Sequence, residues 1–312
     1  MPEYLHRHAQ FADLLRIVAE AKSIDLALVE KDYWIMHGLH GLQRLGLSFE
    51  LKGGTSLSKG LGIIHRFSED IDVRIEPDAG VATGRNHTKA AHIASREAFY
   101  DTLARTIVID GFSSVERDCL FDDARLFSGG IRLHYPTSGS PIAGLKDGIL
   151  LEVGFANVQP NAPHTISSWA YEYALSAGVE VIDNRAVDVA CYHPGYTLVE
   201  KLQAISTKFR RQRGGGEIPP NFMRHYYDVF CLLQNAEVQG FIGTDAYMAY
   251  KAHHFPAADN QVIAENEAFS LSDPATRTTL GASYRRSSAL YYQGQPNFED
   301  VLAEITRWAE RL

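Results

Sequence analysis

The chain has 312 residues, 45% of them hydrophobic and 11% aromatic, which is enough apolar material for one large domain or two of ordinary size. Its formal net charge of −8 excludes a protein that coats nucleic acid through bulk charge, so any nucleic-acid contact needs a local basic surface. Three scattered cysteines without a CxxC pair, and no apolar run of about 18 residues, argue against a zinc cluster, a disulfide framework and a membrane span, and predict a soluble cytoplasmic protein.

The first half of the chain mixes helical and strand patterns. Apolar residues at helical spacing predict two helices, over 11–22 and 25–45. A short strand at 49–51 runs into Gly53 and Gly54, and a helix is expected to open at Thr55 or Ser56. Strict alternation predicts a half-buried strand over 70–76 with charged side chains on one face. Further patterns predict a helix over 87–110 and strands over 130–135 and 149–155.

The second half reads as helical. Helices are predicted over 197–210, 222–235, 244–254 and 298–311. The glycines and prolines of residues 213–220 predict a loop between the first two of these helices. The expected organisation is therefore an α/β (α+β) domain with its N-terminal helices over 1–195, and a helical domain over 196–312.

Carboxylates in two of the predicted strands point to metal chemistry. Asp70 and Asp72 are two residues apart on a strand, so their side chains share a face and could hold one or two divalent cations for phosphoryl transfer. Glu152, in the otherwise apolar strand at 149–155, is the candidate third ligand because a buried acid is costly unless a cation compensates it. The alternative is a surface glutamate on an edge strand.

The glycine pair suggests a phosphate site. Gly53 and Gly54 let the backbone approach a phosphate closely, and Thr55 and Ser56 add hydroxyl donors at the start of the next helix. The segment does not match a P-loop, and a simple tight turn would explain the glycines equally well.

Residues 52–73 carry a specific resemblance, since they read KGGTSLSKGLGIIHRFSEDIDV. This resembles the signature of the AbiEii/AbiGii toxin family, nucleotidyltransferases of the DNA polymerase β superfamily, in which a GG[ST] turn and a helix precede RxSxDxD. Three further segments agree with the family in their order along the chain: Glu30–Tyr33 (EKDY), Glu200–Leu202 (EKL) and Arg224–Asp228, which resembles RDxxD. The resemblance covers roughly residues 28–230. His225 stands where the family commonly has an aspartate, so this chain lacks that acid.

The resemblance implies a nucleotidyltransferase fold with a central mixed sheet, an NTP donor, and Mg²⁺, or Mn²⁺ in its place, on Asp70 and Asp72. It also implies that Lys201 and Asp228, from the helical domain, are essential. Lys201 would neutralise triphosphate charge, and Asp228 would act as a base or orient the lysine or the attacking hydroxyl.

Two residues that lie shortly before the paired aspartates are also candidates. Arg66 would reach a phosphate, or pack over Phe67, and Ser68 would bond the turn.

By the same resemblance the chain is expected to be the toxin of a toxin–antitoxin or phage-defence system, with a cognate antitoxin as partner. The expected reaction is transfer of NMP to an RNA acceptor, the 3′ end of tRNA. Nucleotidylation of a protein or a small molecule is an alternative, because the same site does not select its acceptor. A nucleotide-binding module without turnover is another.

Several motifs also have structural readings. Thr197 and Glu200 have the spacing of a helix capping box, and Arg224 and Asp228 that of a helical ion pair. Residues 30–32 in isolation read as a solvated helix face. Residues 201–224 hold six cations and one acid: Lys201, Lys208, Arg210, Arg211, Arg213 and Arg224 against Glu217. This indicates either a solvated face or a contact with RNA or triphosphate.

Overall fold

The computed structural model describes residues 2–77, 79–137, 145–215 and 221–312. Residues 216–220 of the predicted loop lie outside the described part. The chain forms two compact units, the first made of Met1–Leu61 and Phe67–Tyr192, the second of Gly62–Arg66 and His193–Leu312. The five residues 62–66, between the glycine turn and the paired aspartates, thus belong to the second unit.

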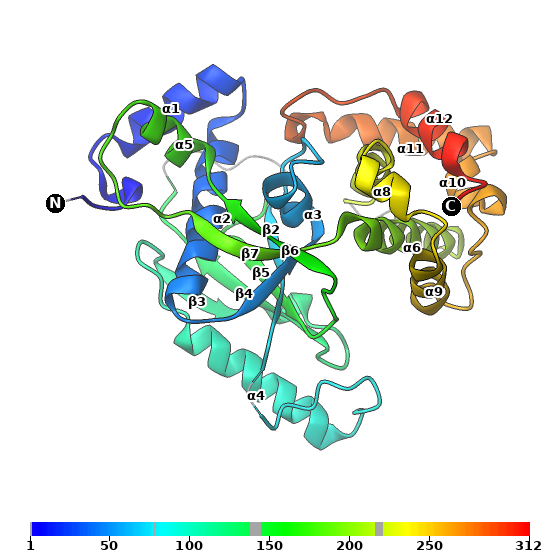
Figure 1. The fold of residues 1–312 in the computed structure, drawn as a ribbon, viewed down its shortest axis with the longest axis horizontal. Helices are drawn as coiled ribbons and strands as arrows, with labels where there is room; N and C mark the ends of the chain where they lie inside the picture. Colours follow the sequence, from blue (N-terminus) through cyan, green and yellow to red (C-terminus); the bar gives the residue numbers. More distant parts are fainter. Residues whose placement is uncertain (1, 78, 138–144, 216–220) are drawn as a thin grey trace. The chain divides into compact units, whose positions relative to one another are not determined.

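The first unit is built on a seven-stranded sheet with the strand order β3-β4-β5-β2-β1-β7-β6 (Figure 1). β2 runs parallel to β5, and β1 parallel to β7, while the other neighbours are antiparallel. This confirms the predicted mixed α/β class. The strands are β1 (Phe49–Lys52), β2 (Asp70–Ile75), β3 (Ser114–Arg117), β4 (Ser128–His134), β5 (Ile149–Gly154), β6 (Asn161–Ile166) and β7 (Ala186–Tyr192).

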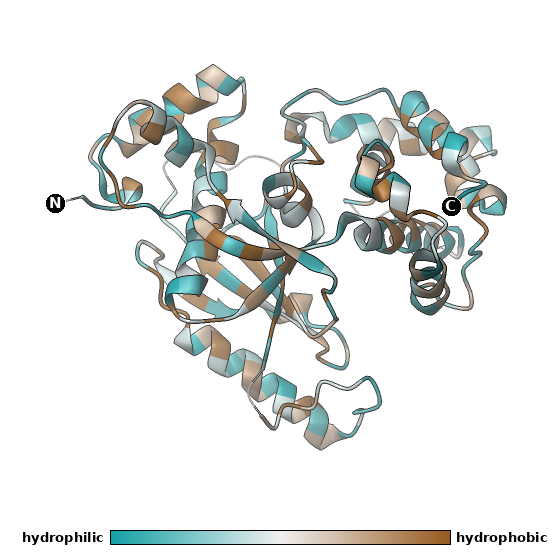
Figure 2. Cartoon of the chain, viewed as in Figure 1, coloured by the Kyte–Doolittle hydropathy of each residue, from teal (hydrophilic) through white to brown (hydrophobic). Residues whose placement is uncertain are grey.

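The two faces of the sheet differ in chemistry. Ile71, Val73 and Leu151 are fully buried, as expected for the apolar set of an alternating strand. Helix α2 (Leu26–Arg44) packs on β5 and β7, and α4 (Ala90–Thr106) on β3 and β4. Figure 2 shows hydrophobic colouring along much of the central strands, and alternating hydrophobic and hydrophilic residues along α4. Alternation places the charged residues of β2 on the opposite face.

The remaining helices of the first unit are short or surround α2. α1 (Phe11–Lys22) and α5 (Trp169–Ser176) pack with α2. Helical turns begin at Gly53 rather than at Thr55 or Ser56, since α3 (Gly53–Thr55) continues into a π-helical turn over Ser56–Gly60. α5 and the strands β3, β6 and β7 were not predicted from the sequence. β3 and β6 are the two edge strands, and their mixed polar and apolar residues give no clean alternation.

The second unit is helical in its described residues, as predicted. Its helices are α6 (Pro194–Arg213), α7 (Arg224–Leu233), α8 (Ala236–Phe241), α9 (Asp245–His254), α10 (Glu267–Ser270), α11 (Pro274–Arg286) and α12 (Phe298–Trp308). α6 packs against α7 and α9, and α7 packs against α12. Residues 62–66 join this unit through a β-bridge between Arg66 and Tyr291 and a hydrogen bond from the His65 amide to the Tyr227 hydroxyl.

The EKDY segment is buried in α2, so the reading of residues 30–32 as a solvated face is wrong. Glu30, Lys31 and Asp32 are only 1–2% exposed. Asp32 accepts a hydrogen bond from the Trp169 amide (2.8 Å) and forms an ion pair with Lys59 (2.5 Å). Since Lys59 lies in the π-helical turn and Trp169 begins α5, Asp32 ties both segments to α2.

No helix in the described ranges is both long enough and apolar enough to cross a membrane.

Asp32→Ala should destabilise the first unit by about 3–5 kcal/mol, because it leaves the ammonium of Lys59 without its counter-charge in a largely buried place. Chemical denaturation followed by circular dichroism measures the loss. Asp13→Ala is the matched control, since the exposed pair of Asp13 with Arg16 should contribute less than about 1 kcal/mol. Equal losses in the two variants would show that the buried pair contributes no more to the free energy of unfolding than the exposed pair.

Candidate active site

A row of charged side chains crosses the polar face of the sheet. Lys52 of β1 pairs in register with Asp72 of β2, and Asp72 with Glu152 of β5. Asp70 lies on the same face of β2, two residues before Asp72. The reading of Glu152 as a residue of an edge strand is wrong, because β5 lies between β2 and β4.

The carboxylates of this row repel one another. Burial raises the pKa of Glu152 to about 7, and the nearby carboxylates of Asp72 and Asp70 add to the rise. Lys52 and Lys146 offset the rise only in part. The positive charge around Glu152 therefore does not offset its burial and its neighbouring carboxylates, a condition that a bound cation relieves.

The chemistry of the donors fits a hard divalent ion. Asp70, Asp72 and Glu152 offer only carboxylate oxygens, which suit Mg²⁺ and Mn²⁺. Within residues 2–77, 79–137, 145–215 and 221–312, no three or more His, Cys, Asp or Glu side chains are grouped closely enough to hold a metal ion as they stand. The three carboxylates would therefore have to approach one another to share one. In this structure the positive charge beside Asp70 is that of a lysine that belongs to none of the sequence motifs.

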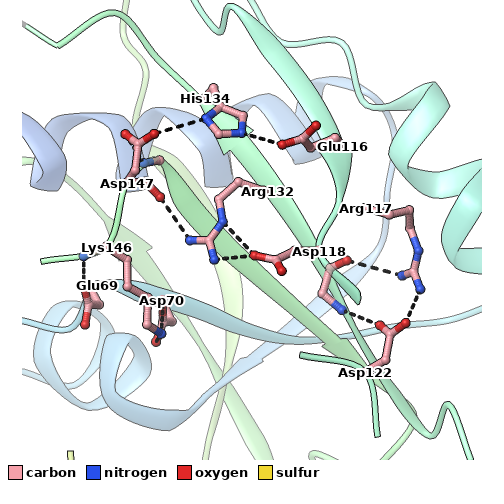
Figure 3. Close-up of polar contacts among 12 residues, drawn as sticks. Glu69, Asp70, Glu116, Arg117, Asp118, Asp122, Arg132, His134, Lys146 and Asp147 are labelled. Carbon is pink, nitrogen blue, oxygen red and sulfur yellow. Dashed lines mark hydrogen bonds and ion pairs between the residues drawn. The ribbon is translucent and has the colours of Figure 1, made fainter. Parts of the chain in front are cut away.

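Lys146 contacts Asp70 directly (Figure 3). Its ammonium lies 3.0 and 3.2 Å from the two carboxylate oxygens of Asp70. Its backbone amide donates to Glu69 (3.0 Å), and its carbonyl accepts a hydrogen bond from the ammonium of Lys31 (2.6 Å). Lys146 belongs to no recognisable motif, and only the contacts of the folded chain show its place beside Asp70.

Charged side chains also hold the segment that enters β5 (Figure 3). Arg132 of β4 donates to the Asp147 carbonyl (3.1 Å) and to the Asp118 carboxylate (2.9 Å). His134 lies 3.7 Å from the Asp147 carboxylate. The contacts of Arg132 and His134 hold Asp147 against β4.

The glycine turn lies against the aspartates. Gly53 has φ +70°, and a Cβ built there would lie 2.0 Å from Oδ2 of Asp72. Glycine is therefore required at this position for both backbone conformation and space. The Thr55 hydroxyl donates to the Asp70 carbonyl (2.6 Å), which ties the turn to the start of β2. Gly54, Thr55 and Ser56 are buried, and Ser68 is half-buried.

Asp228 is the centre of a buried ion cluster in the second unit. Its fully buried carboxylate binds Arg66 through two hydrogen bonds of 2.6 and 2.7 Å and lies 3.1 Å from the ammonium of Lys201. Burial alone would raise the pKa of Asp228, but Arg66 and Lys201 outweigh it and hold that pKa well below its usual range. A helical ion pair with Arg224 therefore does not account for Asp228.

His225 also stands among cations. Burial lowers its pKa well below the usual value, and Lys201 and Lys208 lower it further. Its Nε2 lies 2.6 Å from the ammonium of Lys208, so a neutral imidazole accepts that hydrogen bond. At the position where the family commonly has an aspartate, this chain has an uncharged acceptor.

The other predictions for α6 have mixed outcomes. The capping-box reading is wrong, because the helix begins at Pro194 with His193 as its cap, and Glu200 accepts a hydrogen bond from the Tyr250 hydroxyl (3.2 Å). Part of the basic segment is used within the unit, where Arg210 pairs with Asp259 (2.5 Å). Arg211 and Arg213 are exposed.

The raised pKa of Glu152 predicts how stability depends on pH. Because this pKa is about 7 in the folded chain and about 4.5 ordinarily, the folded state binds more protons than the unfolded state between these pH values. The thermal midpoint of the first unit, measured in EDTA, should therefore fall as the pH rises from about 4.5 to about 7. Glu152→Gln should flatten this dependence. If the exposed control Glu180→Gln flattens it equally, Glu152 is not its source.

Asp228→Asn should destabilise the second unit by about 3–5 kcal/mol, because Arg66 and Lys201 lose the carboxylate that they share. Since the pKa of Asp228 is depressed, its contribution is present above the ordinary aspartate pKa of about 3.9 and is lost in stronger acid. Denaturant titrations at neutral and acid pH measure both effects. The exposed Asp245→Asn is the control, and equal stability of the two variants would contradict the structural role.

Comparisons with known proteins place the chain in a family. A family model described as the nucleotidyl transferase AbiEii toxin of a type IV toxin–antitoxin system matches residues 39–304. A solved structure of an antigenic nucleotidyltransferase-like protein from Paracoccidioides brasiliensis is similar at 12% identity and a TM-score of 0.32, covering 73% of this chain and 95% of that chain. No curated protein matches the sequence. Because the family model spans far more than half of the chain, the chain belongs to the AbiEii nucleotidyl transferase toxin family.

Proposed function

We propose that this nucleotidyltransferase toxin transfers NMP from an NTP to an RNA hydroxyl, at the 3′ end of tRNA, with Mg²⁺ held by Asp70, Asp72 and Glu152. The observation that carries the proposal is the row of carboxylates beside the glycine turn, in which burial and the neighbouring aspartates raise the pKa of Glu152. Such a row suits a reaction whose substrate arrives with divalent cations and a triphosphate.

The reaction is an in-line displacement at the α-phosphate. A bond forms between the acceptor oxygen and the α-phosphorus, the bond from that phosphorus to the oxygen bridging to the β-phosphate breaks, pyrophosphate leaves, and the acceptor hydroxyl gives its proton to solvent. When bound, the divalent ion supplies Lewis-acid stabilisation of the developing charge. Gly53 leaves room beside Asp72. For the phosphates we assign the backbone amides of Gly54 and Thr55 and the hydroxyls of Ser56 and Ser68, because the Thr55 hydroxyl already donates to the Asp70 carbonyl.

For the second-unit cluster we propose one phosphate-binding residue and two positioning residues. Lys201 neutralises triphosphate charge, and Asp228 holds its ammonium at 3.1 Å. Asp228 is unsuited to act as a general base, because Arg66 and Lys201 depress its pKa far below neutrality. Arg66 donates from Nε and Nη2 to the two carboxylate oxygens of Asp228, which favours positioning over phosphate contact.

The acceptor requires a basic surface on an acidic chain. Arg211 and Arg213, exposed at the end of α6, are the side chains of the basic segment that we propose for RNA contact. Raised salt should weaken RNA binding if they dock phosphates. Membership of a toxin–antitoxin family supports a cognate antitoxin as a further partner.

The deciding experiment incubates the protein with each α-labelled NTP, Mg²⁺ and total RNA. Label in tRNA supports the proposal, whereas label in protein or in a small molecule would reassign the acceptor. An NTP that stays bound and intact would indicate a binding module without turnover.

Asp70→Asn and Asp72→Asn should each lower label transfer by about 10³-fold, which corresponds to about 4 kcal/mol in the barrier. The physical reason is that each change removes a negatively charged ligand from the carboxylate row. Asp188→Asn is the matched control, since Asp188 is exposed in the same unit and its positive φ suits asparagine. Wild-type rates in the Asp70 and Asp72 variants would refute the proposed site.

A further inference from the structure

Lys146 occupies the position of a counter-ion at Asp70. Its ammonium lies within 3.2 Å of both oxygens of that carboxylate, and so contacts the two atoms that a divalent ion would use (Figure 3). The pair is only partly buried, with 30% of the Lys146 side chain and 25% of the Asp70 side chain exposed. An ion pair with this exposure is weak enough to be exchanged.

The backbone of Lys146 is much more firmly held than its side chain. Glu69 accepts from its amide and Lys31 donates to its carbonyl, and these two buried residues lie 3.7 Å apart as an ion pair. They are 3% and 1% exposed. The four-carbon stem of a lysine can rotate while such a backbone anchor stays in place.

We propose that Lys146 and the divalent cation compete for Asp70. The ammonium of Lys146 occupies the Asp70 carboxylate while the metal is absent, and it moves to the NTP phosphates when the cation binds. This inference rests on the proposed nucleotidyl transfer and adds a regulatory step to it. Lys31 and Glu69 act as positioning residues through the backbone of Lys146.

The electrostatics of the site favour this exchange. A dication and an ammonium repel each other, so both cannot share the oxygens of Asp70. The triphosphate that arrives with the cation is a stronger attractor for a lysine than one carboxylate. Metal and NTP should therefore bind cooperatively, since each relieves the cost of displacing Lys146.

The test compares Lys146→Met with Lys146→Arg and with the exposed control Lys89→Met. Mn²⁺ binding without nucleotide, measured by electron paramagnetic resonance, should become about fivefold tighter in Lys146→Met, while Lys146→Arg and the control stay near wild type. Binding of mant-labelled ATP and GTP with Mg²⁺ should weaken by about fivefold in Lys146→Met. A thermal melt checks that each variant is folded, and Lys146→Gln serves as a second neutral variant.

Unchanged or weaker Mn²⁺ binding in folded Lys146→Met and Lys146→Gln would overturn the competition. Unchanged NTP binding would overturn the move to the phosphates. If the wild-type protein transfers no nucleotide but both shifts occur, the proposed reaction fails while the competition stands. If transfer occurs and neither shift does, the proposed reaction stands and the competition fails.

Discussion

The first unit depends on one constraint, the crowding of Asp70, Asp72 and Glu152 on one face of adjacent parallel strands. The alternation of β2 sends Ile71 and Val73 into the core, so the aspartates must share the opposite face. Register then puts Glu152 beside Asp72, and the pKa of Glu152 rises to about 7 through burial and this repulsion. Burying the apolar face therefore concentrates negative charge on the polar one, where Lys52 and Lys146 offset only part of it.

The pKa of the Asp228 carboxyl group shifts in the opposite direction from that of Glu152. Asp228 is more deeply buried than the aspartates of β2, yet its pKa is depressed because two cations surround it. Burial alone therefore does not set the direction in which the pKa of a carboxyl group shifts. The difference lies in the local charges: two cations hold Asp228 as a carboxylate, whereas Lys52 and Lys146 only partly offset the carboxylates around Glu152, which supports the proposed cation site there.

The sequence predicted what depends on local pattern. Long amphipathic helices, the alternating strand at 70–76 and the glycine turn follow from spacing and backbone chemistry, and the structure has all of them with shifts of a few residues. The burial of Glu30, Lys31 and Asp32 did not follow, because charged residues in a helix ordinarily face water, and only their partners in the fold compensate them.

Contacts between distant residues were equally hidden in the sequence. The partner of Asp228 is Arg66, 162 residues earlier, and no periodicity connects them. Lys146 lies 76 residues from Asp70, in a segment without a motif. The family resemblance supplied the order of the motifs, but which cation pairs with which carboxylate is set by the packing of the folded chain.

The charges inside α2 suggest why the EKDY segment has its composition. Replacing a buried ion pair with apolar residues is often neutral or stabilising by about 1–4 kcal/mol, so stability alone does not explain the pairs of Lys31 and Asp32. Their common property is what they anchor. Asp32 binds Lys59 in the turn that follows the glycines, and Lys31 binds the carbonyl of Lys146. One helix thus fixes the two segments that lie beside the aspartates, and the directionality of charged hydrogen bonds gives a positional accuracy that apolar packing would not.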